Sequence, residues 1–302
     1  MPPRPSANGF QTGVLNVNKA AGETSFSVVS RLRRLTGANR VGHAGTLDPL
    51  ATGVLPILFE SATRLAEFAL KLPKTYVAQI NFGFVTETDD AEAEPQPVAD
   101  PSRLTVEEIE SALASFCGRI MQEPPSYSAV KVAGKRAYKL ARSGATATLA
   151  AREVEVYDAQ LISFQPGPRA SARAVVRCGS GTYLRAIARD LGRQLGVGGY
   201  LGQLERTAYG GLTLENAVQS DELTTIDAVR DRLLPAEVIL PEMEPVKLTV
   251  EQVAMVRQGR AVRVLPEPGP GLVRAHDSAG KLIALGHTDL LRRTFVPEKV
   301  LN

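Results

Sequence analysis

The chain has 302 residues, of which 44% are hydrophobic, so it can bury a core in one large domain or in two unequal ones. No segment approaches the roughly 20 consecutive apolar residues of a membrane-spanning helix, and no group of Cys, His and Asp residues has zinc-like spacing. A membrane protein and a metal enzyme are therefore disfavoured. The two lone cysteines are typical of a reduced, cytoplasmic protein.

The formal net charge of +3 is unevenly distributed along the chain. Residues 87–100 hold six acidic residues and no Lys or Arg, so the rest of the chain is more basic than the total indicates. A basic excess is typical either of ordinary solvated surface or of a protein with a polyanionic partner.

The N-terminal elements are predicted to be a tail, a strand and a helix. Residues 1–10 are expected to form a loose tail, and residues 13–17 a short strand. The segment KAAGETS at 19–25 follows, and Ser25 is predicted to be the N-cap of a helix that ends at Gly37. The residues expected on the buried face of this helix are Phe26, Val29 and Leu32.

A glycine-rich segment at 42–55, GHAGTLDPLATGVL, contains a single acidic residue, Asp48. Its glycines permit positive φ and close backbone approach, and Pro49 directs Asp48 away from helical backbone, so we predict a shaped loop. The apolar run at 54–59 is short enough to be a buried strand. One carboxylate is thus fixed beside a rigid core element, either as a catalytic group or, as in most Asp-Pro pairs, as the start of a turn.

The next predicted elements are a helix over residues 62–72 and a strand from about Lys74. Tyr76 opens a period-two run of apolar residues that continues to Phe84 and indicates one buried face. Tyr76 is either a core residue or an aromatic surface for a base, since base stacking contributes about 1–3 kcal/mol in single-strand binders. The acidic, proline-containing segment up to residue 101 is predicted to form a flexible loop.

The middle of the chain is predicted to add a helix and two adjacent strands. Thr105 and Glu108 have the spacing of a capping box, at the start of a helix that ends by Gly118. Residues 153–164 and 171–178 have the pattern of strands.

A second helix is predicted after these strands. Its buried positions in helical register are Leu184, Ile187, Leu191 and Leu195. Arg185 falls in its first turn, where the helix dipole disfavours a cation by about 0.3–1 kcal/mol. This position is consistent either with a nearby anion such as Asp48 or with a side chain that reaches solvent.

The pattern changes from about Met243 onward. Prolines punctuate a linker, and a short helix is predicted over residues 249–258. Residues 273–277 and 281–285 flank the turn Ser-Ala-Gly and are predicted to form a hairpin. We therefore expect two domains, residues 1–240 and 241–302.

Several of these segments together resemble the TruB family, the bacterial tRNA pseudouridine-55 synthases. The strongest resemblance is the whole of segment 42–55, which is far more specific than a short glycine pattern. The other matching segments are 19–25, KTY at 74–76, TETDD at 86–90, PPSYSAVK at 124–131, RCGSGTYLR at 177–185 and LERTAYG at 204–210. The chain departs from the family pattern at Ala20, where the family has Pro, and at Glu87, where it has Asp.

The resemblance implies an α/β (α+β) fold of the pseudouridine synthase type. This fold has a mixed, largely antiparallel sheet flanked by helices, here followed by a small β-rich PUA-like C-terminal domain that binds RNA. The resemblance also implies that Asp48 is the catalytic nucleophile. The residues that it assigns to substrate binding are His43, Tyr76, Asp90, Lys131, Tyr183 and Arg185.

Individual roles follow from the same resemblance. Arg185 is expected to pair with Asp48, and Tyr76 and Tyr183 to contact the target nucleotide. His43 is expected to act as a wedge or stacking partner for the displaced base. Lys131 is either a phosphate contact or an ordinary surface lysine.

The implied reaction converts uridine to pseudouridine at position 55 of the tRNA T-loop, with the base flipped out. It breaks the C1′–N1 bond and rejoins the base through C5, so it requires no redox step and no cofactor or metal. Three routes are open to Asp48: attack on the base, attack on C1′, or promotion of proton loss from C2′. The expected partner is the T-arm stem-loop of tRNA, bound by a cytoplasmic monomer with no obligate protein partner.

Two other classes of protein are compatible with parts of the pattern. A non-catalytic RNA-binding or chaperone protein could share the fold, although the presence of Asp48, Tyr76 and Arg185 argues against it. A hydrolase could use Asp48 as its nucleophile, although no second acid or base is recognisably paired with it.

Overall fold

A computed structural model describes residues 9–127, 131–132, 135–136, 149–264, 269, 271–289 and 291–301. Ten strands of these residues form the main sheet. They are β1 (Gly13–Lys19), β2 (Val41–His43), β3 (Thr52–Phe59), β4 (Lys74–Phe82), β7 (Gly118–Gln122), β10 (Arg152–Gln165), β11 (Ser171–Cys178), β12 (Gly199–Tyr209), β13 (Leu212–Thr213) and β14 (Val218–Gln219). Their order is β14-β1-β3-β12-β4-β11-β10-β7, with β2 paired to β3 and β13 to β12. Within this sheet β1–β14 and β3–β12 are parallel and the other pairs are antiparallel, so the predicted mixed, largely antiparallel sheet is confirmed.

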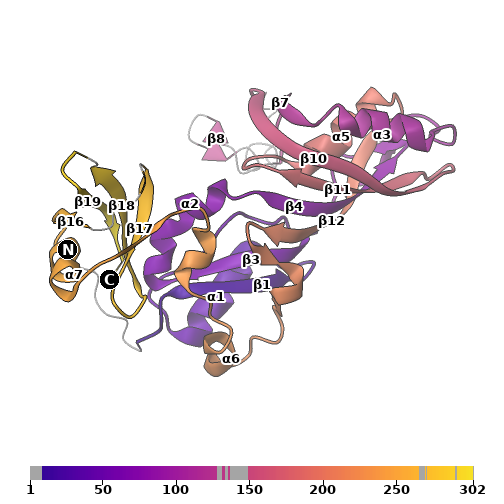
Figure 1. The fold of residues 1–302 in the computed structure, drawn as a ribbon. Helices are drawn as coiled ribbons and strands as arrows, with labels where there is room; N and C mark the ends of the chain where they lie inside the picture. Colours follow the sequence, from indigo (N-terminus) through magenta and orange to yellow (C-terminus); the bar gives the residue numbers. More distant parts are fainter. Residues whose placement is uncertain are drawn as a thin grey trace.

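Helices flank this sheet along its length (Figure 1). They are α1 (Ser25–Thr36), α2 (Ala66–Lys71), α3 (Val106–Ala114), α5 (Leu184–Gln194) and α6 (Ile226–Arg230), with short 3-10 turns η1 (Glu60–Leu65), η2 (Leu214–Asn216) and η3 (Ala236–Ile239). Helix α5 packs on β12 and β4, α3 packs on β10, and α1 packs beside β2. Two further strand pairs lie outside the main sheet: β5 (Phe84–Val85) with β6 (Gln96–Pro97), and β8 (Lys131–Val132) with β9 (Lys135–Arg136).

Helix α1 begins differently from the prediction. Thr24, not Ser25, is its N-cap, and the Thr24 hydroxyl accepts a hydrogen bond from the Ser27 backbone amide. The Ser25 hydroxyl is instead used by the backbone of Leu47, which donates to it and accepts from it. The prediction for Phe26 is also wrong, since its side chain is 75% exposed and Val28 takes the buried position. The predicted end at Gly37 is confirmed by its left-handed backbone.

The C-terminal residues form a second sheet of five strands, which lies at one end of the molecule (Figure 1, yellow). The strands are β15 (Pro245–Lys247), β16 (Val262–Arg263), β17 (Leu272–His276), β18 (Leu282–Asp289) and β19 (Thr294–Val300), and helix α7 (Val250–Arg257) packs against them. The antiparallel pairing of β17 with β18 confirms the predicted hairpin.

The two sheets share part of their hydrophobic packing. Val256, Val273 and Phe295 belong to a core cluster within the C-terminal sheet. Leu285, however, is fully buried in a different cluster, which also contains Val14 of β1. The C-terminal sheet is therefore held against the main sheet by apolar contacts.

None of the helices in the described part of the chain is both long and apolar enough to span a membrane.

Candidate active site

Asp48 lies in the loop that joins β2 to β3, as predicted. Two glycines shape this loop, Gly45 with φ 72° and Gly53 with φ 100°. A Cβ added to Gly53 would lie 2.2 Å from the backbone oxygen of Arg206, so only glycine allows β12 to pass this close. The glycines thus bring the loop into contact with the centre of the sheet.

The loop is anchored on both sides of Asp48. The backbone of Leu47 is bound by Ser25, and the carbonyl of Pro49 accepts a hydrogen bond from the backbone amide of Gly22 at 2.8 Å. The Nζ atom of Lys19 also donates to the Pro49 carbonyl, at 3.4 Å. Because burial strips water from its ammonium group, the pKa of Lys19 falls to about 8.

Arg185 joins Asp48 to a second carboxylate. Its Nε atom lies 3.1 Å from Oδ2 of Asp48, an ion-pair distance, although the direction of Nε–H is poor for a hydrogen bond. Its Nη1 atom lies 3.3 Å from Oδ2 of Asp90. Nη1 also donates to the carbonyl of Thr88, and Nη2 to that of Tyr127. These contacts fix the guanidinium and explain why a cation is stable in the first turn of α5.

The three charged groups differ in their access to solvent. The side chains of Arg185 and Asp90 are 6% and 1% exposed, whereas that of Asp48 is 37% exposed. Burial raises the pKa of the Asp48 carboxyl above its ordinary value, Arg185 opposes this rise, and Asp90 adds to it. Asp48 is therefore the carboxylate of the cluster that a bound molecule can reach.

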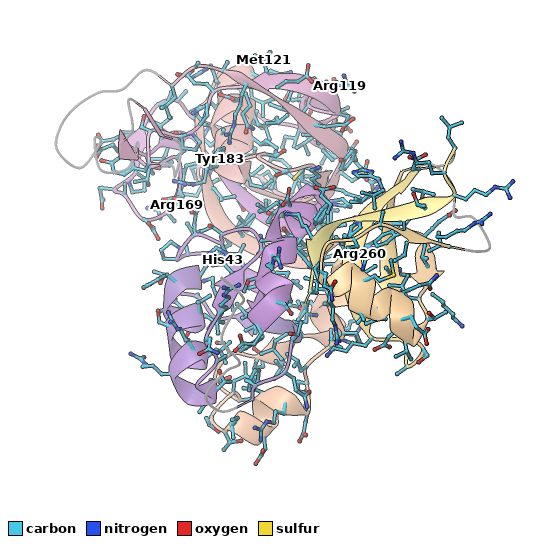
Figure 2. The ribbon with its side chains drawn as sticks, turned by 90° about the vertical axis from the view of Figure 1, so that its left-hand side faces the viewer. His43, Arg119, Met121, Arg169, Tyr183 and Arg260 are labelled. Atoms are coloured by element: carbon cyan, nitrogen blue, oxygen red, sulfur yellow. The ribbon has the colours of Figure 1, made fainter. Side chains whose placement is uncertain are left out.

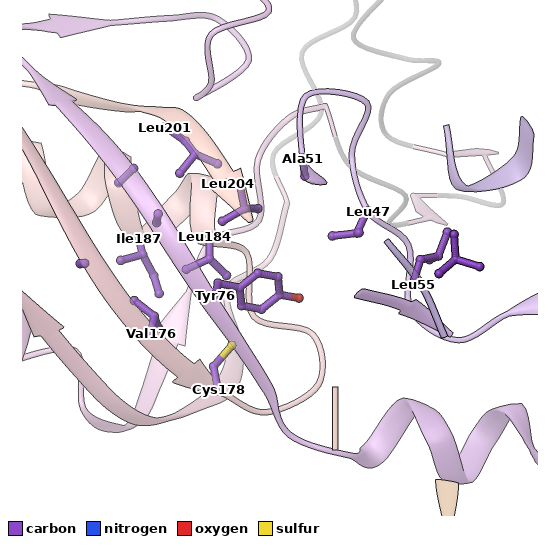
Figure 3. Close-up of a cluster of buried hydrophobic side chains, with 14 of the residues drawn as sticks. Leu47, Ala51, Leu55, Tyr76, Val176, Cys178, Leu184, Ile187, Leu201 and Leu204 are labelled. Carbon is purple, nitrogen blue, oxygen red and sulfur yellow. The ribbon is translucent and has the colours of Figure 1, made fainter. Parts of the chain in front are cut away.

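Tyr76 lies beside this cluster, near the start of β4. Its side chain is 8% exposed, and Figure 3 shows its ring among Leu184, Leu204 and Cys178. The hydroxyl points out of the apolar cluster, toward the loop that carries Leu47. Burial raises the pKa of the Tyr76 hydroxyl, so the side chain is a neutral phenol at pH 7.

His43 lies at the end of β2, directly before the Asp48 loop, and is half-buried. Its Nδ1 atom is buried and has no hydrogen-bond partner among the residues that the structure describes. Burial, together with the charge of Arg206, lowers the pKa of its imidazole. A neutral ring of this kind can pack against a base, and it is poorly suited to bind a phosphate by charge.

Tyr183 is the N-cap residue of α5 and is half-buried. Its backbone amide and carbonyl both bond to the side-chain amide of Gln122, at 2.8 and 3.2 Å. The guanidinium of Arg152 lies 4.9 Å from the centre of its ring. In Figure 2 Tyr183 and His43 both lie near the middle of the view, Tyr183 in the upper part and His43 in the lower part.

The structure brings most of the predicted site residues together. Asp48, Asp90 and Arg185 are in direct contact, and Tyr76 lies beside the Asp48 loop. Lys131 belongs to β8, whose side chains lie outside the described residues, so the prediction for it is not tested. Sequence reasoning gave no role to Arg206, which lies against the same loop. Two signals were available: its position in the matching segment 204–210, and the period-two pattern of β12, which puts this cation on the same face as the buried Leu204.

Comparison with solved structures defines the class of the fold. A chain from a crystal structure of a Cbf5-Nop10-Gar1 complex matches with a TM-score of 0.72 and 25% identity, over 96% of this chain and 85% of that chain. A structure of an H/ACA RNP bound to a substrate RNA containing 2′-deoxyuridine matches with the same TM-score and 23% identity, over 96% of this chain and 85% of that chain. The protein thus has the fold of the pseudouridine synthases.

Comparison of sequences defines the family. Residues 33–184 match the model of the TruB family pseudouridylate synthase N-terminal domain. The tRNA pseudouridine synthase B of a Synechococcus species is 43% identical over 91% of this chain and 93% of its own length. The enzyme of the same name from Solibacter usitatus is 39% identical over 92% of this chain and 96% of its own length. The chain belongs to the TruB family.

Proposed function

We propose that this protein is a tRNA pseudouridine synthase that isomerises uridine at position 55 in the T-loop. The observation that carries the proposal is the ion pair between Asp48 and Arg185, in which the Asp48 carboxylate stays partly exposed to solvent. Membership of the family and the names of its relatives support the same activity. The reaction breaks the C1′–N1 bond, forms a C1′–C5 bond, and exchanges the hydrogen on C5 for one on N1.

Asp48 acts on the nucleoside, and Arg185 keeps it ionised and oriented. A partly buried carboxylate without a cation would be protonated more readily, which would remove its negative charge and most of its nucleophilicity. Asp90 holds Arg185 from the opposite side and does not reach the substrate itself. This division of roles follows from the exposures of the two carboxylates, 37% and 1%.

The remaining site residues bind the flipped nucleotide. Tyr76 packs against the detached uracil while it turns, and Tyr183 contacts the same nucleotide from the start of α5. His43 fills the place of the displaced base in the T-loop. Base extraction costs a few kcal/mol, which stacking on these rings and contacts to the RNA backbone offset. Lys131 is proposed to contact a phosphate.

The remaining proposals concern the whole protein. Residues 1–240 form the catalytic domain, and residues 241–302 form a PUA-like domain that adds affinity for RNA. The protein acts as a monomer in the cytoplasm on the T-arm stem-loop, without a guide RNA or protein partner. If an isolated T-arm stem-loop were inert, and full tRNA reacted only with added protein, this last proposal would be wrong.

Release of tritium from a tRNA transcript labelled at C5 of uridine tests the activity. We expect release without ATP, metal or redox cofactor, and no release from a transcript with cytidine at position 55. A non-catalytic RNA-binding protein would bind both transcripts and release nothing. A hydrolase would free uracil or cleave the RNA, which chromatography of the digested product distinguishes from pseudouridine.

A further inference from the structure

Arg206 is one of the largest fully buried side chains in the described part of the protein. It lies on β12 and is 1% exposed. Its Nε atom donates to the carbonyl of Val54 at 2.6 Å, and its Nη2 atom to the carbonyl of Gly45 at 3.0 Å. These two carbonyls lie on opposite sides of Asp48 in the chain. One guanidinium therefore closes the base of the loop that carries Asp48.

The same guanidinium lies against two aromatic rings. Its carbon atom is 5.0 Å from the ring centre of Tyr209 and 6.0 Å from that of Tyr76. The positive charge of Arg206 lowers the pKa of the Tyr76 hydroxyl, against the larger effect of burial. Arg206 thus contacts both groups that face the proposed substrate, the Asp48 loop and Tyr76.

The charge of Arg206 has no carboxylate within ion-pair distance among the described residues. A buried cation is costly unless it is paired or hydrogen-bonded, and here carbonyl oxygens and aromatic faces supply the compensation. Uncharged side chains of similar size would fill this volume at a lower cost. A structural role alone therefore does not explain why an arginine stands here.

The glycines of the loop fit around this residue. A Cβ on Gly45 would lie 3.0 Å from the ring of Tyr209 and 3.5 Å from Nη1 of Arg206. A Cβ on Gly53 would meet the backbone of Arg206 itself. The loop has the shape that allows Arg206 to reach both of its ends.

We infer that Arg206 is a positioning residue for the reaction: it fixes the Asp48 loop relative to Tyr76, so that the carboxylate and the phenol hold one geometry around the substrate. This inference rests on the proposed synthase activity. A displacement of about 1 Å in a reacting group can cost about 100-fold in rate. Since Arg206 is buried, it is expected to affect the chemical step and not the affinity for RNA.

Two substitutions test this inference, Arg206→Lys and Arg206→Met. Lysine keeps the charge but cannot bond both carbonyls with the fixed fork of a guanidinium. Methionine fills a similar volume and removes the charge and both bonds. The matched control is Arg177→Lys, because Arg177 also lies over a tyrosine ring, that of Tyr157 at 5.3 Å, but both side chains are exposed.

The measurement is the single-turnover rate of tritium release at saturating tRNA, expressed per RNA-bound enzyme, together with tRNA affinity from filter binding. Circular dichroism and thermal melting report the folded fraction. For Arg206→Lys we expect a rate reduced about 100-fold with affinity within about threefold, and for Arg206→Met a rate at least as low. Arg177→Lys is expected to match the wild type.

A wild-type rate per bound molecule in Arg206→Lys would overturn the inference, because the fork would then be dispensable. Loss of tRNA binding in parallel with the rate would also overturn it, since Arg206 would then act in folding or in RNA binding. Failure of the proposed function is a separate outcome, because in that case the wild-type protein itself would release no tritium.

Discussion

Oδ2 of Asp90 lies 3.3 Å from Nη1 of Arg185, on a side chain that is 1% exposed. Asp90 also organises its own turn, since its Oδ1 atom accepts hydrogen bonds from the Thr88 hydroxyl at 2.5 Å and from the Glu92 amide at 3.0 Å. The Asp90 carboxylate is thus fixed by its own turn and holds Arg185 in place. Asp48 contacts the same guanidinium on the side that solvent can reach.

Replacement of Asp90 by asparagine is expected to lower both stability and rate. The carboxamide can keep the bonds within the turn but leaves Arg185 without its buried partner. Loss of one partner of a buried pair costs about 3–5 kcal/mol, and we expect about 3 kcal/mol here. Urea denaturation measures this change in stability. The rate of tritium release at saturating tRNA should fall more than about tenfold, because Arg185 has lost the buried carboxylate that fixes its position. An Asp90→Asn protein with wild-type stability and rate would contradict the supporting role.

Replacement of Asp48 by asparagine is expected to abolish turnover. The substitution conserves shape and removes the nucleophilic charge, whereas a single partly exposed carboxylate contributes little to affinity for a polyanion. Binding of tRNA should stay within several-fold of the wild type, as measured by filter binding. Asp100→Asn, at an exposed aspartate, is the matched control and should retain full activity. Appreciable turnover by Asp48→Asn would show that the nucleophile is another group.

The sequence predicted the local elements of the site well, because each depends on neighbouring residues. The loop at Asp48 follows from its glycines and Pro49, and the helix before it ends at Gly37 as expected. The choice between Thr24 and Ser25 as N-cap could not be made locally, because it depends on Leu47, which takes the Ser25 hydroxyl. The exposure of Phe26 follows from the same shift.

Contacts between segments that lie far apart in the chain could not be predicted from local sequence patterns. Strands β3 and β12, which carry Val54 and Arg206, are separated by about half of the chain and pair in parallel. The segment at 91–101, predicted as a flexible acidic loop, contains β6, which pairs with β5, and Asp90 directly before it is buried. Only the family resemblance linked Asp90 to the site before the structure did.

The pH dependence of the rate should report the surroundings of Asp48. Because burial raises the pKa of this carboxyl, we expect the single-turnover rate to fall on acidification at a pH above the ordinary aspartate value of 3.8. Arg185 favours the ionised form, so Arg185→Gln should raise the pKa further and shift the acid limb to higher pH, in addition to slowing the reaction.

The control for this shift is Arg189→Gln, which removes a cation one turn further along α5. Arg189 pairs with Asp89 and Asp190, not with Asp48. The acid limb of the pH–rate profile of Arg189→Gln should therefore coincide with that of the wild type. A shift to lower pH in Arg185→Gln would contradict the assignment of the titrating group to Asp48.

The contact between the two sheets should make their stabilities interdependent. Leu285 of β18 is fully buried in a cluster that also contains Val14 and Leu58 of the main sheet. We expect Leu285→Ala to lower the free energy of unfolding by about 2–5 kcal/mol, in one cooperative transition followed by circular dichroism in urea. Leu291→Ala, in the turn between β18 and β19 at a side chain that is 99% exposed, should have little effect. Equal stabilities of the two variants would show that the shared cluster contributes nothing.

The affinity of the C-terminal sheet for RNA is best tested by charge removal. Truncation near Pro241 would remove Leu282, Leu285 and Leu301 from the hydrophobic cluster that the two sheets share, so a change in binding could not be assigned to the RNA interface alone. Arg257 and Arg260 are exposed at the end of α7, where their removal breaks no apolar packing. The double substitution Arg257→Ala and Arg260→Ala keeps the fold and removes only charge.

We expect this double variant to bind tRNA more weakly and to flatten the dependence of log affinity on log salt by about 0.7–0.9 for each phosphate that is no longer neutralised. The single-turnover rate at saturating tRNA should be unchanged, because both arginines lie outside the cluster around Asp48. The matched control removes two exposed arginines near α6, Arg230→Ala with Arg232→Ala, and should keep the wild-type salt slope. Identical slopes for both double variants and the wild type would mean that tRNA does not contact this end of α7.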